Sequence, residues 1–164
     1  MNPIEIKING LVNKTPNDIC SILLDTNRWS EFEGYSILPG IEKAEFEKRT
    51  AEVVGSRIKT RNTDGSSHVE EIIEWDVNKK VVFKFQEFNS PLKNFATHFI
   101  EEWNFFAKDE GTEIERSMKM YPKHVMGWLI LKPISILMKK ALEKNLMQFS
   151  SDNNIIENKK RKIK

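Results

Sequence analysis

The chain has 164 residues, of which 39% are hydrophobic and 30% are charged. This length fits one domain with a sizeable core, and the composition excludes an intrinsically disordered chain. The formal net charge is +2, but five of the 26 basic residues lie in the last six positions, 159–164. Without these five, 21 basic and 24 acidic residues remain, and a net charge of −3 gives no general attraction to nucleic acid. We expect a domain over residues 1–152 and a basic, disordered tail over residues 153–164.

The cysteine, histidine and glycine patterns exclude several kinds of site. The single cysteine, Cys20, cannot form an internal disulfide or a cysteine-only zinc site, and its apolar neighbours indicate a buried structural thiol. His68, His98 and His124 are far apart in the sequence and share no helix-face spacing, so we expect no metal site. Because the chain also has no Gly-rich phosphate loop and no dinucleotide fingerprint, we expect no cofactor.

No segment has the pattern of a secretion signal or a membrane span. The first residues alternate apolar and polar side chains and lack the continuous apolar run of a signal peptide. The most apolar window, residues 125–138, is shorter than the roughly 20 residues of a spanning helix, and Lys132 and Pro133 interrupt it. The expected location is the cytoplasm.

The first 32 residues predict a strand followed by two short helices. Residues 4–8 alternate between isoleucine and polar side chains, which is typical of a half-buried strand. The run Thr15-Pro16-Asn17-Asp18 predicts a helix start, with a threonine cap, a proline at the first helical position and an early acid. This helix should end near Leu24, and a second helical piece should contain Trp29 and Phe32.

Residues 41–121 predict an antiparallel meander of six strands. Turn sequences at Asp64-Gly65, Asn78-Lys79-Lys80 and Asp109-Glu110-Gly111 separate stretches of alternating apolar side chains. The predicted strands are Ile41–Lys48, Val53–Asn62, Ser67–Trp75, Lys80–Phe88, Phe95–Ala107 and Thr112–Tyr121.

A long helix is predicted at the end of the chain. Apolar residues from Met126 to Phe149 recur at spacings of three and four, and Pro133 should kink or restart the helix. The resulting order of strand, two helices, six strands and helix excludes a doubly wound parallel fold, which needs a helix after each strand. We therefore predict an α+β fold.

Three local motifs in this order resemble the START-like superfamily, also called the SRPBCC or polyketide cyclase/dehydrase and lipid-transport superfamily. Asp25-x-x-x-Trp29-x-x-Phe32 is similar to its segment between the small helices and the second strand. Val54-Gly55-Ser56 resembles the glycine-containing start of its third strand, and Gly111-Thr112 resembles the opening of its last strand. The resemblance covers roughly residues 2–150. It implies a helix-grip fold, in which a curved antiparallel sheet wraps around a long C-terminal helix, with a hydrophobic cavity between them.

Strand alternation predicts which side chains line that cavity. Apolar residues dominate one face of each strand, and the same alternation places Glu71, Glu101 and Arg116 on this face. A buried charge is costly unless it is paired, so a carboxylate should lie beside Arg116. The expected ligand-binding residues are Trp29, Phe32, Ile58, Thr60, Glu71, Ile73, Phe83, Phe85, Thr97, Phe99, Glu101, Trp103, Arg116, Met118, Met120, Trp128, Leu131 and Met138.

The three charged residues have two interpretations. They form an internal ion pair or reach solvent at a strand end, or they anchor a ligand's carboxylate or hydroxyl group in an otherwise apolar pocket. No catalytic residue is assigned, but Glu71, Glu101 and Arg116 are candidates.

The resemblance implies binding of a small hydrophobic molecule, such as a lipid, a quinone or a polyketide-like aromatic compound, for sequestration or transport. The alternatives are an enzyme of the cyclase or dehydratase type that uses a pocket carboxylate, and an adaptor that faces a membrane or a protein. We expect no nucleic-acid partner and weak contact with a membrane surface through the C-terminal tail. A monomer and a homodimer both remain open.

Overall fold

The computed structural model describes the backbone of residues 1–161 and the side chains of residues 1–150. The helix predicted at residue 15 has a complete capping box, in which the Thr15 hydroxyl accepts from the Asp18 backbone N–H and the Asp18 carboxylate accepts from the Thr15 N–H. The elements are β1 (Ile4–Val12), α1 (Pro16–Leu24), the 3₁₀ helix η1 (Thr26–Glu31), β2 (Ile41–Lys48), β3 (Arg57–Asn62), β4 (Ser67–Asp76), β5 (Lys80–Gln86), α2 (Leu92–Phe95), β6 (Ala96–Lys108), β7 (Gly111–Pro122) and α3 (Val125–Arg161).

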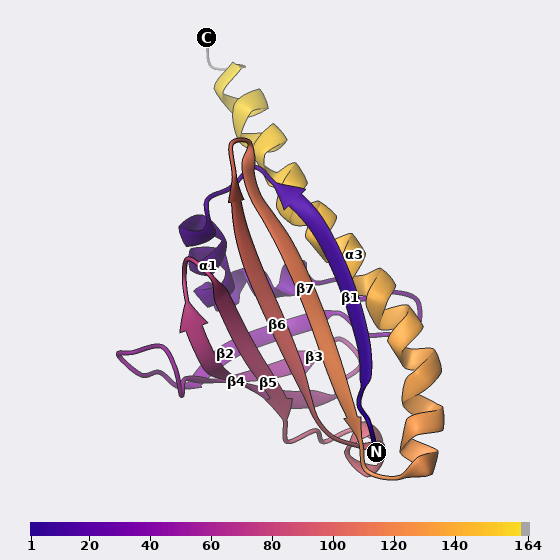
Figure 1. Ribbon diagram of the computed structural model, residues 1–164. Coiled ribbons are helices and arrows are strands. Elements are labelled where there is room, and N and C mark those ends of the chain that lie inside the picture. The colour runs from indigo at the N-terminus through magenta and orange to yellow at the C-terminus, as the bar shows by residue number, and fades with distance from the viewer. Residues whose placement is uncertain (162–164) are drawn as a thin grey trace.

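All seven strands form one antiparallel sheet with the order β1-β7-β6-β5-β4-β3-β2. The six strands after η1 are neighbours in sequence order, and β1 joins the sheet beside the last of them. The sheet is strongly curved, and α3 runs along it beside β1 and β7, as Figure 1 shows. The predicted α+β helix-grip architecture is therefore confirmed.

The core fills the space between the concave side of the sheet and the helices. Ile114, Met118 and Met120 of β7 are almost completely buried, as are Leu142 and Leu146 of α3. Alternate side chains of the strands point inward, and the stripe on α3 packs against them. Cys20 on α1 belongs to the same core, and burial raises the pKa of its thiol to about 12, as expected of a structural cysteine.

The helices α2 and α3 meet at a point where only glycine fits. A Cβ atom on Gly127 would lie 2.2 Å from the backbone oxygen of Phe95, the last residue of α2. The start of α3 thus lies directly against the end of α2, which holds the helix at one end of the sheet. Gly111 makes a similar approach to the Val12 carbonyl at a φ of +136°.

Most predicted boundaries agree with the structure to within two residues, but three details differ. The strand expected from Val53 begins at Arg57, because Val53 and Gly55 have φ angles of +69° and +83° and belong to a turn. The short helix α2 was not predicted. The last helix continues through Pro133 without a restart.

The structure describes only part of the predicted C-terminal tail, residues 153–164. The backbone of α3 reaches Arg161, and residues 162–164 lie outside the described residues. Disorder over 153–164 therefore stays a prediction.

Candidate ligand-binding cavity

A cavity of about 360 Å³ lies between the inner face of the sheet, α3, and the segments around η1 and α2. Its size is within the range of pockets that hold small organic ligands. Strands β4 to β7 contribute its central wall, and α3 contributes Ile134, Met138, Leu142, Asn145 and Phe149. Leu38 and Pro39, which lie in the loop between η1 and β2, complete another side.

The cavity wall is mainly apolar, and its aromatic side chains pack against one another. The rings of Phe88 and Phe99 lie 5.1 Å apart, and those of Trp103 and Phe149 lie 5.7 Å apart. Trp29 from η1 meets Phe83 of β5 edge to face at 6.2 Å. Rings that pack against one another in this way keep their positions, so the wall presents a fixed apolar surface to a ligand.

One charged group, Arg116 of β7, is buried within this wall. Its Nε donates to Glu101 Oε1 at 2.7 Å, and its Nη1 donates to Asn145 Oδ1 at 2.8 Å. The guanidinium group also lies 4.1 Å from the centre of the Trp103 ring, the residue directly opposite it on β6. Only 7% of the Arg116 side chain and 5% of the Glu101 side chain are exposed, so the ion pair is shielded from water.

A second polar pair, Glu70 and His68 of β4, lines the same cavity. His68 Nε2 lies 3.0 Å from Glu70 Oε1, and the imidazole ring stacks on Phe85 at 5.4 Å. Burial raises the pKa of Glu70; the hydrogen bond with His68 opposes this shift, and the charge of Glu101 adds to it. The cavity therefore has a buried polar region that contains two carboxyl groups, one guanidinium group and one imidazole ring.

No family model and no curated protein sequence matches the chain. Many solved structures match its fold. The protein TTHA0849 from Thermus thermophilus has a TM-score of 0.67 and 18% identity, with 90% of this chain and 95% of that chain covered.

Two further matches have descriptive names. The START superfamily protein from Mycobacterium smegmatis has a TM-score of 0.60 and 12% identity, and the match covers 90% of this chain and 99% of that one. The chain has a START-like fold. The di-domain ARO/CYC protein StfQ from the steffimycin biosynthetic pathway matches with a TM-score of 0.67 and 13% identity, over 92% of this chain and 50% of the longer one.

The START-like fold brings together more than half of the residues predicted to bind a ligand. The predicted parity is correct for β7 and for β6 from Phe99 onward, and the inward side chains there include the ion pair. At the start of β6, an irregularity between Ala96 and His98 turns Thr97 outward. A carboxylate was expected beside Arg116, and Glu101 occupies that position. The predicted residues that line the cavity are Trp29, Phe32, Phe83, Phe85, Phe99, Glu101, Trp103, Arg116, Met118 and Met138.

The other eight predicted residues lie outside the cavity lining, in three kinds of position. Ile58, Thr60, Met120 and Leu131 are buried in other parts of the core. Ile73 is 41% exposed, Thr97 is exposed and donates to the Tyr121 carbonyl, and Trp128 packs at the edge of the core beside Lys132. The last of the eight, Glu71, was also a catalytic candidate.

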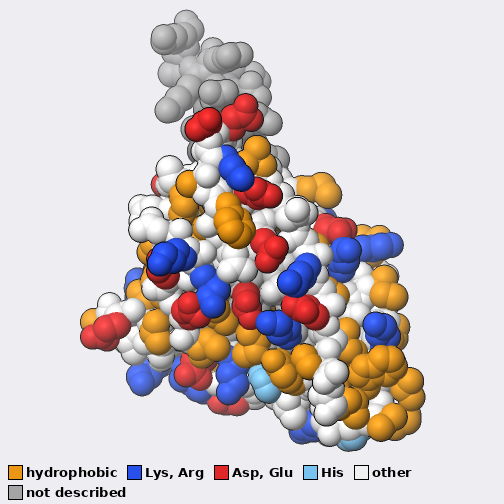
Figure 2. All heavy atoms as spheres, viewed as in Figure 1, with side chains coloured by type: hydrophobic (Ala, Val, Ile, Leu, Met, Phe, Trp, Pro, Cys, Tyr) orange, Lys and Arg blue, Asp and Glu red, His pale blue; other side chains and the backbone are white. Residues whose placement is uncertain are grey.

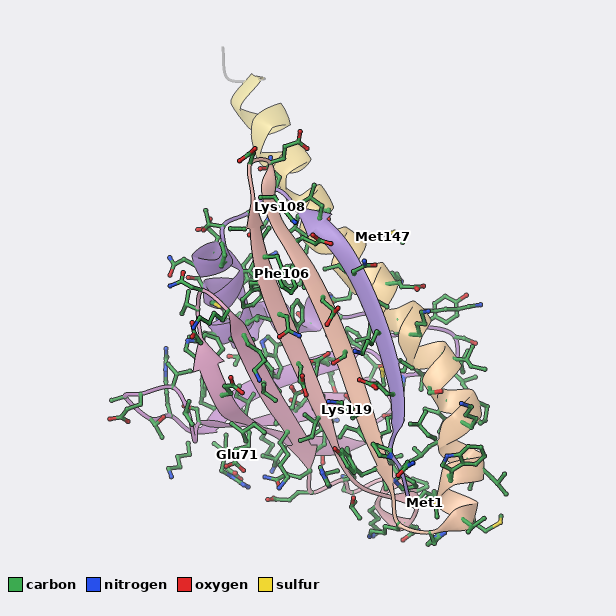
Figure 3. All side chains as sticks on the ribbon, viewed as in Figure 1. Met1, Glu71, Phe106, Lys108, Lys119 and Met147 are labelled. Carbon is green, nitrogen blue, oxygen red and sulfur yellow. The ribbon has the colours of Figure 1, made fainter. Side chains whose placement is uncertain are left out.

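The inward orientation predicted for Glu71 is wrong. Its carboxylate accepts from Gln86 at 2.8 Å and lies 3.9 Å from Arg57, at the surface seen in Figure 3. A bulge in β4 between Ile72 and Glu74 changes the alternation, so Glu70 points inward while Trp75 still packs on the core. Uninterrupted alternation from Trp75 therefore predicts the wrong inward glutamate, Glu71 in place of Glu70. The same alternation predicts an outward orientation for His68, which lines the cavity.

Asn145 is a cavity-lining residue that was not predicted from the sequence, although a signal was present. It continues the spacing of Met138, Leu142 and Phe149, so it is a polar residue on the inward stripe of α3. Among the residues with described side chains, no three His, Cys, Asp or Glu side chains converge as metal ligands.

Removal of Arg116 should destabilise the fold strongly. In Arg116→Met, the Glu101 carboxylate loses its partner in a buried site, which should lower the free energy of unfolding by about 3–5 kcal/mol. The double variant Arg116→Met/Glu101→Leu should recover part of this loss, because no buried charge remains. Urea unfolding measures both values. Lys43→Met, which breaks an exposed pair with Glu45, is the control and should change little. Equal decreases in the free energy of unfolding in Lys43→Met and Arg116→Met would contradict a stabilising role of the buried ion pair.

Glu70 should make stability depend on pH. Because its pKa is raised in the folded protein, the folded state holds the proton more tightly than the unfolded chain does. This contribution to stability is complete at low pH and is lost as the pH rises above the ordinary glutamate value. Glu70→Gln should therefore gain more stability relative to the original protein at about pH 8 than at about pH 5. The exposed Glu52→Gln should show no such trend, and a Glu70→Gln difference that is constant with pH would contradict the assignment.

Proposed function

We propose that this protein binds a small, mainly apolar molecule in the cavity, either to sequester it or to transport it. The observation that carries the proposal is the buried Arg116 network within a mainly apolar wall. Specific ligand pockets combine a large apolar surface with a few fixed polar groups. The fold is similar to that of an ARO/CYC protein from a biosynthetic pathway, and this similarity supports a small organic ligand in the cavity.

The charges around Arg116 favour a neutral ligand over an anion. Glu101 already neutralises the guanidinium group, and Glu70 adds a second carboxyl group nearby. A ligand carboxylate would give this water-poor region a net negative charge, which is costly in a medium of low polarity. A carbonyl or hydroxyl oxygen can instead accept from the remaining guanidinium N–H groups without adding charge.

This charge balance separates the ligand classes considered from the sequence. A quinone or a polyketide-like aromatic molecule has flat rings that stack on Phe and Trp side chains, and carbonyl or hydroxyl oxygens that suit Arg116. A fatty acid places an anion at the same point. We therefore favour a neutral, oxygen-bearing aromatic compound as the ligand. We also propose that the protein is located in the cytoplasm, where a free cysteine such as Cys20 stays reduced.

An acid–base enzyme is a second candidate, and the Glu70–His68 pair favours it. A buried glutamate with a raised pKa beside an imidazole ring is suited to exchange a proton with a molecule in the cavity. In this case Arg116 would polarise a carbonyl group of the substrate. Glu70 thereby replaces Glu71 as the candidate carboxylate. Conversion of a bound ligand that stops in Glu70→Gln, while binding continues, would distinguish this enzyme from a carrier.

Two probes of similar shape test the proposed ligand class. Neutral naphthol should quench the fluorescence of Trp29 and Trp103, which line the cavity. The anion naphthoate should bind at least about tenfold more weakly at neutral pH, a difference of roughly 1.4 kcal/mol. Titration of the protein with each probe gives both dissociation constants.

A matched pair of variants locates the binding site. Met138→Trp fills part of the cavity and should weaken naphthol binding by about tenfold or more. Met147→Trp makes the same change on the same helix at a side chain that is 68% exposed, and it should have no effect (Figure 3). Equal effects of the two variants, or no binding of either probe, would contradict the proposed function.

A further inference from the structure

The first half of α3 has an exposed face that is partly apolar. Val125, Met126, Leu129 and Ile136 are 65%, 58%, 53% and 59% exposed, respectively. They follow one another at helical spacings, so they lie on one side of the helix, opposite the stripe that packs on the sheet. Figure 2 shows hydrophobic side chains gathered over the start of α3, at the lower right. Single exposed apolar residues are common, but several on one helix face form a continuous surface.

From Val125 to Lys140 the same face is basic and contains no acid; Glu143 is the next side chain along it. Lys132, Lys139 and Lys140 lie between and beside the apolar residues, at the same three- and four-residue spacings. The sequence has no aspartate or glutamate between Glu115 and Glu143. Within the part of the chain whose side chains are described, none of these three lysines forms an ion pair; Lys132 lies over Trp128 and Lys140 over Tyr35. We call Val125, Met126, Leu129, Lys132, Ile136, Lys139 and Lys140 the basic apolar face.

We propose that the basic apolar face docks on an anionic lipid surface. A helix with apolar residues on its outer side and lysines along them lies in the plane of a membrane interface, with the apolar side chains among the acyl chains and the ammonium groups at the lipid phosphates. The face is suited to lying on a bilayer rather than crossing it, since no helix among the described residues is long and apolar enough to span one.

Charge distinguishes this lipid surface from a second copy of the chain. Two identical faces in a symmetric dimer would bring six lysines together, and residues 125–140 supply no acid to pair with them. Anionic lipids supply the missing negative charges, and their surface potential attracts each lysine. The surface therefore fits a lipid headgroup layer better than itself.

The docking face also lies close to the cavity. Ile134 and Met138 line the cavity from the inner side of the segment of α3 that carries Leu129 and Ile136 on its outer side. Lys140 contacts Tyr35, in the loop whose Leu38 and Pro39 also line the cavity. A protein docked in this way would hold its cavity beside the lipid layer, where apolar molecules dissolve.

Vesicle binding tests the proposal with the full chain. Vesicles of phosphatidylcholine with about 30% phosphatidylserine should bind the protein in a flotation assay, and pure phosphatidylcholine vesicles should bind it at least about tenfold more weakly. Leu129→Glu/Ile136→Glu should reduce binding to the anionic vesicles by at least about tenfold. Phe106→Glu, a change at a 50% exposed side chain on β6, is the matched control and should leave binding unchanged (Figure 3).

Two further measurements make the result decisive. A variant with the five basic residues of 159–164 changed to glutamine should keep most of its vesicle binding; complete loss would assign the contact to the tail and overturn the proposal. Absence of binding to anionic vesicles would also overturn it, as would dimerisation of the protein that Leu129→Glu/Ile136→Glu abolishes. Retained naphthol binding in this double variant would show that it folds and that the cavity functions independently of the docking face.

Discussion

The buried ion pair between Arg116 and Glu101 is the contact on which the rest of the site depends. It joins β7 to β6, and the hydrogen bond to Asn145 extends it to α3, so one guanidinium group links the two long strands to the helix that they hold. An isolated charge in this position would strongly oppose folding. The three elements must therefore adopt their native arrangement together for Arg116 to be satisfied.

The same contact gives the cavity its chemical character. Aromatic side chains provide a large apolar surface but little preference for orientation. The paired guanidinium group adds fixed donors, and the carboxyl groups of Glu101 and Glu70 prevent it from acting as a simple anion receptor. The proposed selection of a neutral ligand rests on this balance of charges, and the proposed docking of the basic apolar face of α3 would place the cavity beside a lipid surface.

Local sequence was sufficient to predict most of the fold. Local sequence patterns predicted elements that are present in the structure. Examples are the helix cap at Thr15, the turn at Gly111 and the apolar stripe of α3. Regular alternation correctly placed Glu101 and Arg116, because β6 and β7 pair without interruption over this stretch. In β4, the bulge after Ile72 breaks the alternation, and no residue type in that strand marks it.

The cavity was harder to predict than the strands that form it. Ile58, Thr60 and Met120 have the correct inward parity, yet other core residues cover them. Whether an inward residue lines a cavity or fills the core depends on the curvature of the sheet and on the distance of the helix, which no single strand encodes. Leu38 and Pro39 lie in a loop, where a periodicity argument does not apply. Phe88 was placed in the predicted strand, but β5 ends at Gln86 and Glu87 has a φ of +57°, so the alternation stops before Phe88.

The four tryptophans provide the most direct test of the central claim, which is that a neutral ligand binds beside Arg116. Trp29 and Trp103 line the cavity, whereas Trp75 and Trp128 lie outside its lining. The measurement is the two-dimensional NMR spectrum of the four indole N–H groups during addition of naphthol. The account predicts that the signals of Trp29 and Trp103 move and that those of Trp75 and Trp128 stay in place. Movement of the Trp128 signal alone, or of none of the four signals while naphthol binds, would contradict it.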